Sequence, residues 1–247
     1  MLSFITLIAL VGMLVFPTFM ITITYPFSKK AALFWSNYIS TRCARLFFAI
    51  LKKYRGFTLD MDEESKKNLP ENFILLSNHQ SLMDIVVYFN FFDGLRVRFV
   101  AKDSLEKVPM VGKMLKSQGH CMIPRKGKNS VAMQRLDQFG ERVEKNKFLP
   151  LIFPEGTRSR TGQLGKFYAA GFRRLSETVN LPVVVCALDG GWQLRDLKSL
   201  MSKLKKGVYH VKVLKVYDKP ASKEDEKKII EEAPLLIQKQ LDEWRNA

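Results

Sequence analysis

His79 and Asp84, five residues apart, are the pair of side chains in this sequence best suited to move a proton. An imidazole whose second nitrogen is held by a carboxylate keeps one tautomer and gains a stabilised cation, so it can act as a general base. The apolar run 72–76 predicts a strand before His79, and 83–89 predicts a helix or a second buried run after it. We therefore expect His79 at a strand's carboxyl end, where open α/β sheets bind ligands. Taken alone, such a pair is more often an ordinary satisfied contact.

A second candidate stretch is Phe-Pro-Glu-Gly-Thr-Arg-Ser-Arg at 153–160, which follows the predicted strand 148–153. Gly156 lets the backbone turn and present N–H groups, and Thr157 adds a hydroxyl. Arg158 adds the planar fork that grips phosphate oxygens in pairs. The loop therefore predicts a site for a phosphate monoester, although a loop of this kind is also typical of a solvated turn.

Two more basic residues directly follow predicted strands, namely Lys102 and Arg125. Each one alone is more typical of surface charge. Because the carboxyl ends of parallel strands meet at one edge of a sheet, we expect His79, Lys102, Arg125 and the loop 155–158 to converge on one rim. This convergence favours a functional site over four unrelated surface features.

Strand-length apolar runs alternate with helical patterns along most of the chain, which predicts an α/β fold with a mostly parallel sheet flanked by helices. The stretch 56–70 reads as a polar approach to the first strand. We expect an antiparallel edge strand near Val208. A final surface helix over 222–244 begins with a capping box at Ser222 and Asp225, and Pro234 should kink or divide it. The other predicted strands are 98–101, 121–123, 148–153, 182–188 and 208–216.

The amino-terminal segment 1–28 carries no charged residue, and 2–23 is long enough to enter or cross a bilayer as a helix. It lacks the basic start and small-residue exit of a cleaved signal peptide. The next segment, 30–51, is aromatic and interrupted by arginines, which predicts an interfacial helix. The basic residues Lys52, Lys53 and Arg55 mark the cytoplasmic side. We thus expect a two-helix membrane anchor over 1–55 and a catalytic domain over 56–247, with a pair of soluble core helices as the alternative.

The formal net charge of +16 calls for an anionic partner such as phosphate, anionic lipid, an acidic protein or nucleic acid. Nucleic acid is disfavoured, because the aromatic residues concentrate in the apolar amino-terminal part and do not interleave with a basic groove. Three widely spaced cysteines indicate neither a disulfide framework nor a zinc site. His79, His120 and His210 are also scattered, so no metal is expected.

Four ordered motifs resemble those of the glycerolipid acyltransferases, and within that family most closely the 1-acyl-sn-glycerol-3-phosphate acyltransferase group. They are Asn78-His79-x4-Asp84, Gly119-x5-Arg125, the run 153–158 and Leu-Pro-Val-Val at 181–184. The resemblance spans about 72–188, and the two amino-terminal apolar segments are similar to the membrane-embedded motif of bacterial members. Pro124, Met122 and Val185 depart from residues common in the family, which puts substrate preference in doubt more than chemistry.

The resemblance implies transfer of an acyl chain from acyl carrier protein or coenzyme A to the hydroxyl of lysophosphatidate, giving phosphatidate at the cytoplasmic face of a membrane. It gives His79 and Asp84 the catalytic roles, with no cofactor beyond the acyl donor. The substrate contacts it implies are Asn78, Lys102, Arg125, Glu155, Gly156, Thr157 and Arg158. Ser81 has no nucleophile-elbow glycines around it, so direct transfer is favoured over an acyl-enzyme. The alternatives are an acyltransferase for glycerol 3-phosphate or another lysophospholipid, and a non-catalytic lipid-binding protein.

Overall fold

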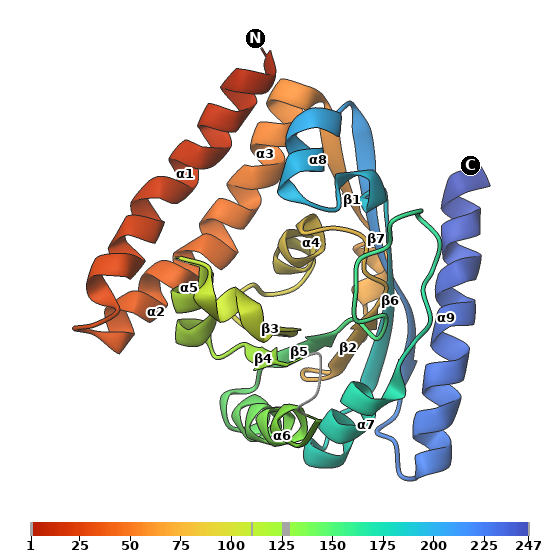
Figure 1. The fold of residues 1–247 in the computed structure, drawn as a ribbon. Helices are drawn as coiled ribbons and strands as arrows, with labels where there is room; N and C mark the ends of the chain where they lie inside the picture. Colours follow the sequence, from red (N-terminus) through yellow and green to blue (C-terminus); the bar gives the residue numbers. More distant parts are fainter. Residues whose placement is uncertain (1, 110, 125–128, 247) are drawn as a thin grey trace.

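A seven-stranded sheet forms the centre of the protein in a computed structural model that describes residues 2–109, 111–124 and 129–246 (Figure 1). The strand order is β1-β7-β6-β2-β5-β3-β4, and the five strands from β6 to β4 run parallel. The predicted α/β fold with a mostly parallel sheet is confirmed. The strands are β1 (Phe57–Met61), β2 (Ile74–Ser77), β3 (Val97–Lys102), β4 (Cys121–Ile123), β5 (Leu149–Ile152), β6 (Val183–Asp189) and β7 (Gly207–Tyr217).

The strand predicted near Val208 is antiparallel, as expected, but it is not the edge of the sheet. β7 pairs with β6 on one side and with β1 on the other, where Phe57 faces Gly207 and Met61 faces Val211. The stretch 56–70, predicted as a polar approach, therefore contains the true edge strand. Of the five residues of β1 only Phe57 is buried, because an edge strand needs little apolar surface. The sequence of β1 therefore looks like the polar residues around it.

Helices cover both faces of the sheet. One face carries α3 (Ala44–Arg55), α4 (Met83–Phe91) and α5 (Val111–Gln118), and the other carries α6 (Asn129–Asn146), α7 (Ala169–Thr178) and α9 (Lys223–Asn246). Successive residues of a strand point to opposite faces, so β6 contributes side chains to the hydrophobic core on each face of the sheet. Its residues Val184, Cys186 and Leu188 pack with the first layer, and Val183, Val185 and Ala187 with the second.

The last helix, α9, confirms the capping box and corrects the expectation at Pro234. Asp225 N donates to Ser222 Oγ at 3.1 Å, and Ser222 N donates to Asp225 Oδ2 at 2.9 Å. The helix is not divided at Pro234 but continues from Lys223 to Asn246. Buried residues on both sides of the proline, Ile229 and Ile237, pack against the same core and hold the helix together.

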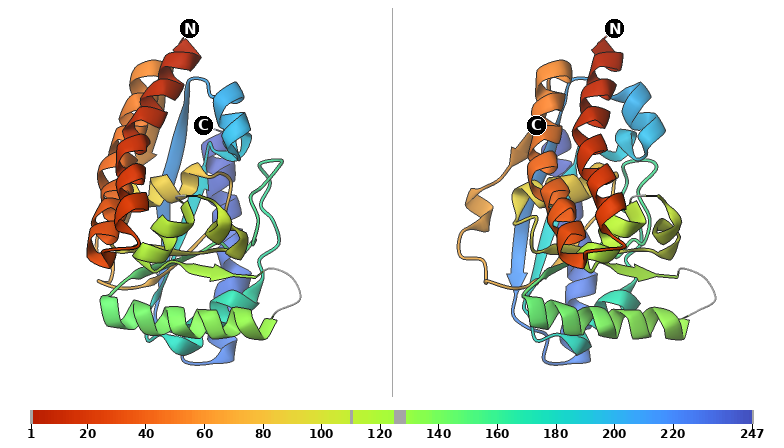
Figure 2. Two further views of the ribbon diagram at one scale, coloured as in Figure 1. Left: turned by 60° about the vertical axis from the view of Figure 1, so that its left-hand side comes forward. Right: turned by 90° about the vertical axis from the view of Figure 1, so that its left-hand side faces the viewer.

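The amino-terminal part consists of α1 (Leu2–Thr24), α2 (Lys29–Tyr38), a π-helical turn (Ile39–Cys43) and α3 (Ala44–Arg55). α1 lies outermost and packs on α2 and α3 (Figure 2). Within the part of the chain that the structure describes, one stretch, Ile5–Thr24, is long and apolar enough to cross a membrane by length and composition. Only 22% of the most apolar window in that stretch is buried, so α1 differs from a core helix.

The second segment of the predicted anchor packs against the protein core. Ala44, Phe48 and Leu51 of α3 share one cluster with the sheet and α4. Gln118 Nε2, at the end of α5, lies 3.2 Å from the Ser36 carbonyl and 2.9 Å from Ser40 Oγ. A buried amide with such partners fixes α2 and the π-helical turn to the sheet layer. The two-helix anchor is therefore not confirmed, and α3 shares its buried cluster with the sheet.

Candidate active site

His79 and Asp84 form a hydrogen-bonded pair at the carboxyl end of β2. Asp84 stands in the first turn of α4 and is fully buried, whereas 16% of the His79 side chain is exposed. Asp84 Oδ2 lies 2.6 Å from His79 Nδ1 and accepts from Gln80 N at 2.7 Å. Because an ionised carboxylate only accepts hydrogen bonds, we place the histidine proton on Nδ1. Nε2 then keeps the lone pair of a base.

Asp84 Oδ1 has donors of its own. It accepts from Ser81 N at 3.0 Å and from the hydroxyl of Tyr209 on β7. A buried charge is stable only when it is paired and hydrogen-bonded, and four donors meet that requirement here. The carboxylate is thus locked in place before any substrate binds.

The His79 ring stacks on Phe153, with 4.1 Å between the ring centroids and 12° between the planes. Its backbone is held as firmly, since His79 N donates to Glu155 Oε1 at 2.7 Å and Ser159 N donates to the His79 carbonyl at 2.8 Å. Gly165 N occupies the other Glu155 oxygen at 2.8 Å. Burial raises the pKa of Glu155, while the two backbone N–H groups act in the opposite direction. This geometry makes Glu155 a brace between the loop and His79, not a free substrate ligand.

Asn78 has a similar bracing geometry. Its amide nitrogen donates to the Leu188 carbonyl at 2.8 Å, and its amide oxygen accepts from Leu188 N at 2.8 Å. The side chain is buried between the ends of β2 and β6. We therefore reassign Asn78 from a predicted substrate contact to the support of the His79 turn.

Four of the remaining predicted substrate residues, Lys102, Gly156, Thr157 and Arg158, stand at the open edge of the site. β2, β5 and β3 are adjacent and parallel, which brings His79, the loop after β5 and Lys102 to one edge as predicted. Lys102 and Thr157 are exposed, and Gly156 adopts a left-handed φ of 65° with open space around it. Arg158 is half-buried and donates from Nη1 to the Arg195 carbonyl. Arg125 lies outside the described residues.

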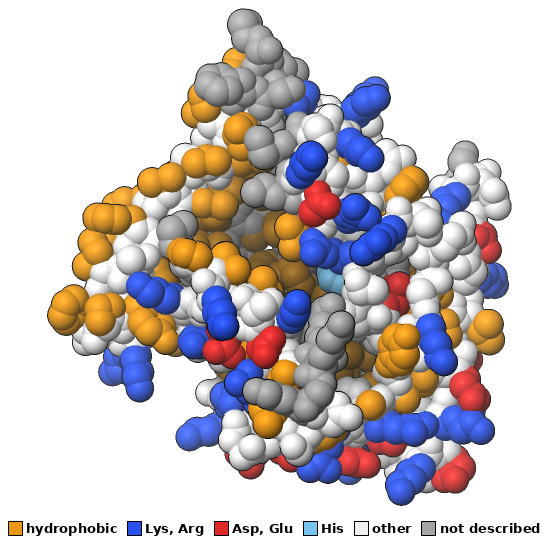
Figure 3. Space-filling model, viewed as in Figure 1, with side chains coloured by type: hydrophobic (Ala, Val, Ile, Leu, Met, Phe, Trp, Pro, Cys, Tyr) orange, Lys and Arg blue, Asp and Glu red, His pale blue; other side chains and the backbone are white. Residues whose placement is uncertain are grey.

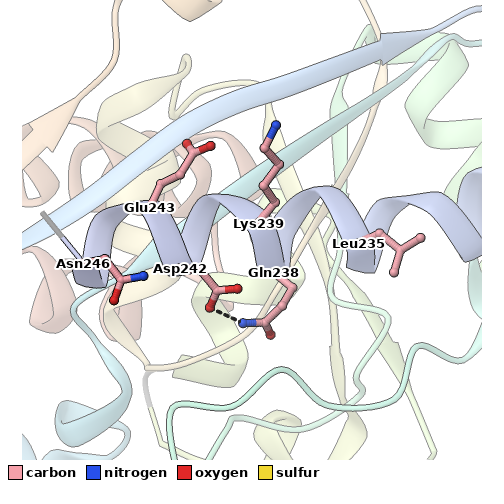
Figure 4. Close-up of a pocket in the computed structure, with 6 residues that line it drawn as sticks. All are labelled: Leu235, Gln238, Lys239, Asp242, Glu243 and Asn246. Carbon is pink, nitrogen blue, oxygen red and sulfur yellow. Dashed lines mark hydrogen bonds between the residues drawn. The ribbon is translucent and has the colours of Figure 1, made fainter.

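Figure 3 shows this side of the molecule hollowed, with apolar walls, Lys and Arg side chains around the rim and a histidine at the edge of the hollow. Such a combination suits a ligand with an anionic head and an apolar chain. A separate shallow depression runs along the exposed face of α9 (Figure 4). It is lined by a single helix, and its Gln238 Nε2 donates to Asp242 Oδ1 at 2.7 Å. Nothing there resembles a catalytic arrangement.

Sequence reasoning missed a buried chain of polar residues behind His79. Gln80 Nε2 donates to Asp189 Oδ1 at 2.9 Å, and Gly191 N donates to Gln80 Oε1 at 3.0 Å. Arg245 of α9 grips Asp189 with two bonds of 2.7 and 2.8 Å. Burial raises the pKa of Asp189, but the bonds from Arg245 and Gln80 outweigh it and lower the pKa overall. Gln80 stands inside the first motif, whereas Arg245 carried no local signal.

The described residues contain no group of three or more His, Cys, Asp or Glu side chains placed to hold a metal ion. His79, Asp84 and the basic rim are the polar groups that the site presents to a ligand. These groups can take a proton from a hydroxyl and attract a phosphate.

Comparison with known proteins fits this chemistry. The family model described as Acyltransferase matches residues 60–189, which include His79, Asp84 and the loop with Arg158. The chain belongs to this acyltransferase family. The matched segment ends at Asp189, so Tyr209 and Arg245 lie beyond it.

Curated relatives of this chain include two 1-acyl-sn-glycerol-3-phosphate acyltransferases. The protein of Saccharomyces cerevisiae is 33% identical over 152 residues, which are 60% of this chain and 48% of that protein. The protein of Pseudomonas aeruginosa is 35% identical over 126 residues, which are 51% of this chain and 48% of that protein. The chain thus spans about half the length of these relatives.

A solved structure shares the fold along the whole chain. It is the 1-acyl-sn-glycerophosphate acyltransferase PlsC from Thermotoga maritima, with a TM-score of 0.63 and 22% identity. The match covers 100% of this chain and 94% of that one. At this identity the likeness speaks for the fold alone.

Proposed function

We propose that this acyltransferase moves a fatty acyl chain from a thioester of acyl carrier protein or coenzyme A to the hydroxyl of lysophosphatidate, giving phosphatidate. The observation that carries the proposal is the imidazole of His79, fixed through Nδ1 by a buried Asp84 and left with a basic Nε2. The names of the curated relatives favour lysophosphatidate as the acceptor.

The reaction follows from that geometry. His79 Nε2 takes the proton of the acceptor hydroxyl as its oxygen attacks the thioester carbonyl. The new C–O bond gives a tetrahedral oxyanion, which collapses by breaking the C–S bond. The imidazolium returns its proton to the departing thiolate, so the enzyme ends unchanged. Asp84 accepts the Nδ1 hydrogen throughout and stabilises the transient cation.

The basic rim supports an acceptor that carries a phosphate. The bond from Arg158 Nη1 to the Arg195 carbonyl orients the guanidinium and leaves its other N–H groups for a ligand. Lys102 adds a second charge two strands away from His79. A phosphate held at this rim would leave the acceptor's free hydroxyl near Nε2, which is the geometry that direct transfer needs.

The exposed apolar face of α1 supports a place for the enzyme on a membrane. Val15, Phe16 and Phe19 are 57%, 58% and 58% exposed, and Phe27 after the helix is 86% exposed. Burying such surface in lipid is favourable, and both the proposed acceptor and product are lipids. Lys52, Lys53 and Arg55 at the end of α3 favour the cytoplasmic side of that membrane.

An acceptor panel tests the proposal. The purified full chain is offered a labelled acyl thioester together with lysophosphatidate, glycerol 3-phosphate, lysophosphatidylcholine or monoacylglycerol, and products are identified by mass. We expect phosphatidate from lysophosphatidate and little product from the neutral or choline-bearing acceptors. Faster transfer to glycerol 3-phosphate would reassign the acceptor. Lipid binding without transfer to any member of the panel would contradict the catalytic proposal.

A further inference from the structure

Tyr209 is a buried phenol that reaches the catalytic pair from a distant part of the chain. It stands on β7, 125 residues from Asp84, and its side chain is completely buried. Its hydroxyl donates to Asp84 Oδ1, the oxygen that does not face His79. The three side chains thus form a continuous hydrogen-bonded chain from Tyr209 through Asp84 to His79.

The end of β6 is shaped around that hydroxyl. A Cβ added to Gly191 would lie 1.9 Å from the Tyr209 hydroxyl oxygen, so no larger residue fits there without moving the phenol. The preceding Gly190 has a φ of 97°, and a Cβ there would lie 2.1 Å from the Val208 carbonyl oxygen. Two consecutive glycines therefore let the backbone close over Tyr209. The close contact leaves little room for a water to replace the hydroxyl.

The hydroxyl keeps its proton over the working pH range. Burial and the neighbouring charge of Asp84 raise the pKa of Tyr209 well above its ordinary value. A protonated phenol can donate to the carboxylate, and a donor lowers the charge that the carboxylate directs at its other partners. The strength with which Asp84 holds the imidazolium of His79 thus depends on Tyr209.

We propose that Tyr209 is a positioning residue of the active site. Its hydroxyl fixes the Asp84 carboxylate against His79 and weakens the attraction between that carboxylate and the imidazolium. The effect on turnover rests on the proposed acyl transfer, whereas the effect on His79 itself does not. Without the hydroxyl, three donors share the Asp84 charge in place of four. The carboxylate should then accept more strongly from His79 Nδ1–H, so the hydrogen bond between the two side chains should strengthen.

The other ionisable groups around the pair have partners of their own. Glu155 accepts from two backbone N–H groups, and Asp189 is bound by Arg245 and Gln80. Tyr88 of α4 is as buried as Tyr209, but its hydroxyl donates to Ser77 Oγ at 2.6 Å. Tyr88 therefore provides a matched control, a buried phenol in the same core that does not bond to Asp84.

The test compares Tyr209→Phe with Tyr88→Phe in the full chain. The Nδ1–H proton of His79 is followed by NMR on histidine-labelled protein, with His120 and His210 assigned by substitution. We expect Tyr209→Phe to move this proton resonance downfield, as a stronger hydrogen bond to Asp84 would, and Tyr88→Phe to leave it unchanged. This measurement needs no acceptor, so it stands even if the proposed substrate is wrong.

Turnover provides the second measurement. Loss of one hydrogen bond to a charged group should slow transfer about tenfold in Tyr209→Phe. The same change added to Asp84→Asn should cost less than about twofold more, because Tyr209 acts through Asp84. An unchanged His79 Nδ1–H resonance in Tyr209→Phe, or a full tenfold loss in the Asp84→Asn background, would overturn the proposal and leave Tyr209 with a role in core packing alone.

Discussion

Arg158 is the residue at which the proposed phosphate site can be tested most selectively. It holds the Arg195 carbonyl with one nitrogen and has further N–H groups at the rim of the site. A lysine keeps the charge but cannot hold that carbonyl and a phosphate with one planar fork. We predict that Arg158→Lys lowers kcat/KM for lysophosphatidate roughly tenfold to a hundredfold, which corresponds to about 1.5–3 kcal/mol. Steady-state kinetics with varied acceptor would measure this loss.

Two measurements serve as controls for Arg158→Lys: the KM of the thioester donor and the rate of transfer to a neutral acceptor. We expect the KM of the thioester and the slow transfer to monoacylglycerol to change little, because neither depends on the acceptor phosphate. Arg173→Lys, at an exposed position of α7, is the matched control and should resemble the wild type. Equal losses toward lysophosphatidate and monoacylglycerol would show that Arg158 holds the loop and not the phosphate.

The residues that could be predicted from the sequence are those that lie close together along the chain. His79 and Asp84 are five positions apart, and their contact needs only one turn of backbone. Tyr209, by contrast, reaches Asp84 only because β7 runs antiparallel beside β6, in a register that the sequence does not encode locally. The supporting contacts of Asn78 and Glu155 could not be predicted for a related reason, since a motif shows which residues gather but not which of them face the substrate.

At the scale of elements, α9 closes the back of the site through one ion pair. Arg245 binds Asp189, which in turn holds Gln80 next to His79. Asp189 is 6% exposed, so Arg245→Ala would leave a buried carboxylate without its main partner. We predict that Arg245→Ala lowers the free energy of unfolding by about 1.5–3 kcal/mol at neutral pH, as measured by denaturant titration in detergent.

The free energy of unfolding that is lost in Arg245→Ala should be larger at neutral pH than at acidic pH. The pKa of Asp189 is lowered in the folded protein, so the ion pair contributes its full stability above the unfolded value, which is about 3.9. That contribution disappears as the pH falls through the lower folded value. The gap between wild type and Arg245→Ala should therefore be widest near neutrality and shrink below about pH 4. Lys239→Ala, on the exposed face of the same helix, should show no gap at any pH (Figure 4).

The positions of most strands and helices along the chain could be predicted well. Which strand lies at the sheet edge, and whether the last helix continues past Pro234, could not. Alternating apolar runs located the five parallel strands, because buried strands are nearly continuous in apolar residues. β1 was missed since Thr58 and Asp60 break its apolar pattern at a solvent-facing edge. Pro234 was expected to kink or divide the last helix, and the helix is not divided, because burial on both sides of the proline overrides the local preference for a break.

For the molecule as a whole, α1 is the part that should bind the membrane. Its exposed apolar residues form a continuous face, while α2 and α3 hold it to the catalytic layer. We predict that membranes retain the wild type in about 1 M salt and release it with detergent, because burial in lipid is not screened by ions. Immunoblotting of the soluble and pelleted fractions would measure the distribution.

Charged substitutions on α1 test whether this helix is the part that binds the membrane. Val15→Asp with Phe19→Asp places two carboxylates where lipid is expected, at a cost of about 2.5–3.5 kcal/mol each near the bilayer centre. The double variant should appear largely in the soluble fraction. Leu235→Asp, at a 70% exposed position of α9, should stay in the pellet. Retention of the α1 variant, or release of the wild type by salt alone, would contradict a lipid-embedded α1.

The whole molecule also contains its own control for the central claim, because it has a second histidine–aspartate pair. His210 on β7 lies 2.8 Å from Asp60 on β1 through the same pair of atom types, but both side chains are partly exposed and far from the loop after β5. The most direct measurement is the rate of phosphatidate formation from lysophosphatidate by His79→Ala and His210→Ala, each purified and shown to be folded. We predict a loss of about two to four orders of magnitude for His79→Ala and a rate within about twofold of wild type for His210→Ala. Near-normal transfer by His79→Ala would show that His79 is not the base and would contradict the proposed mechanism.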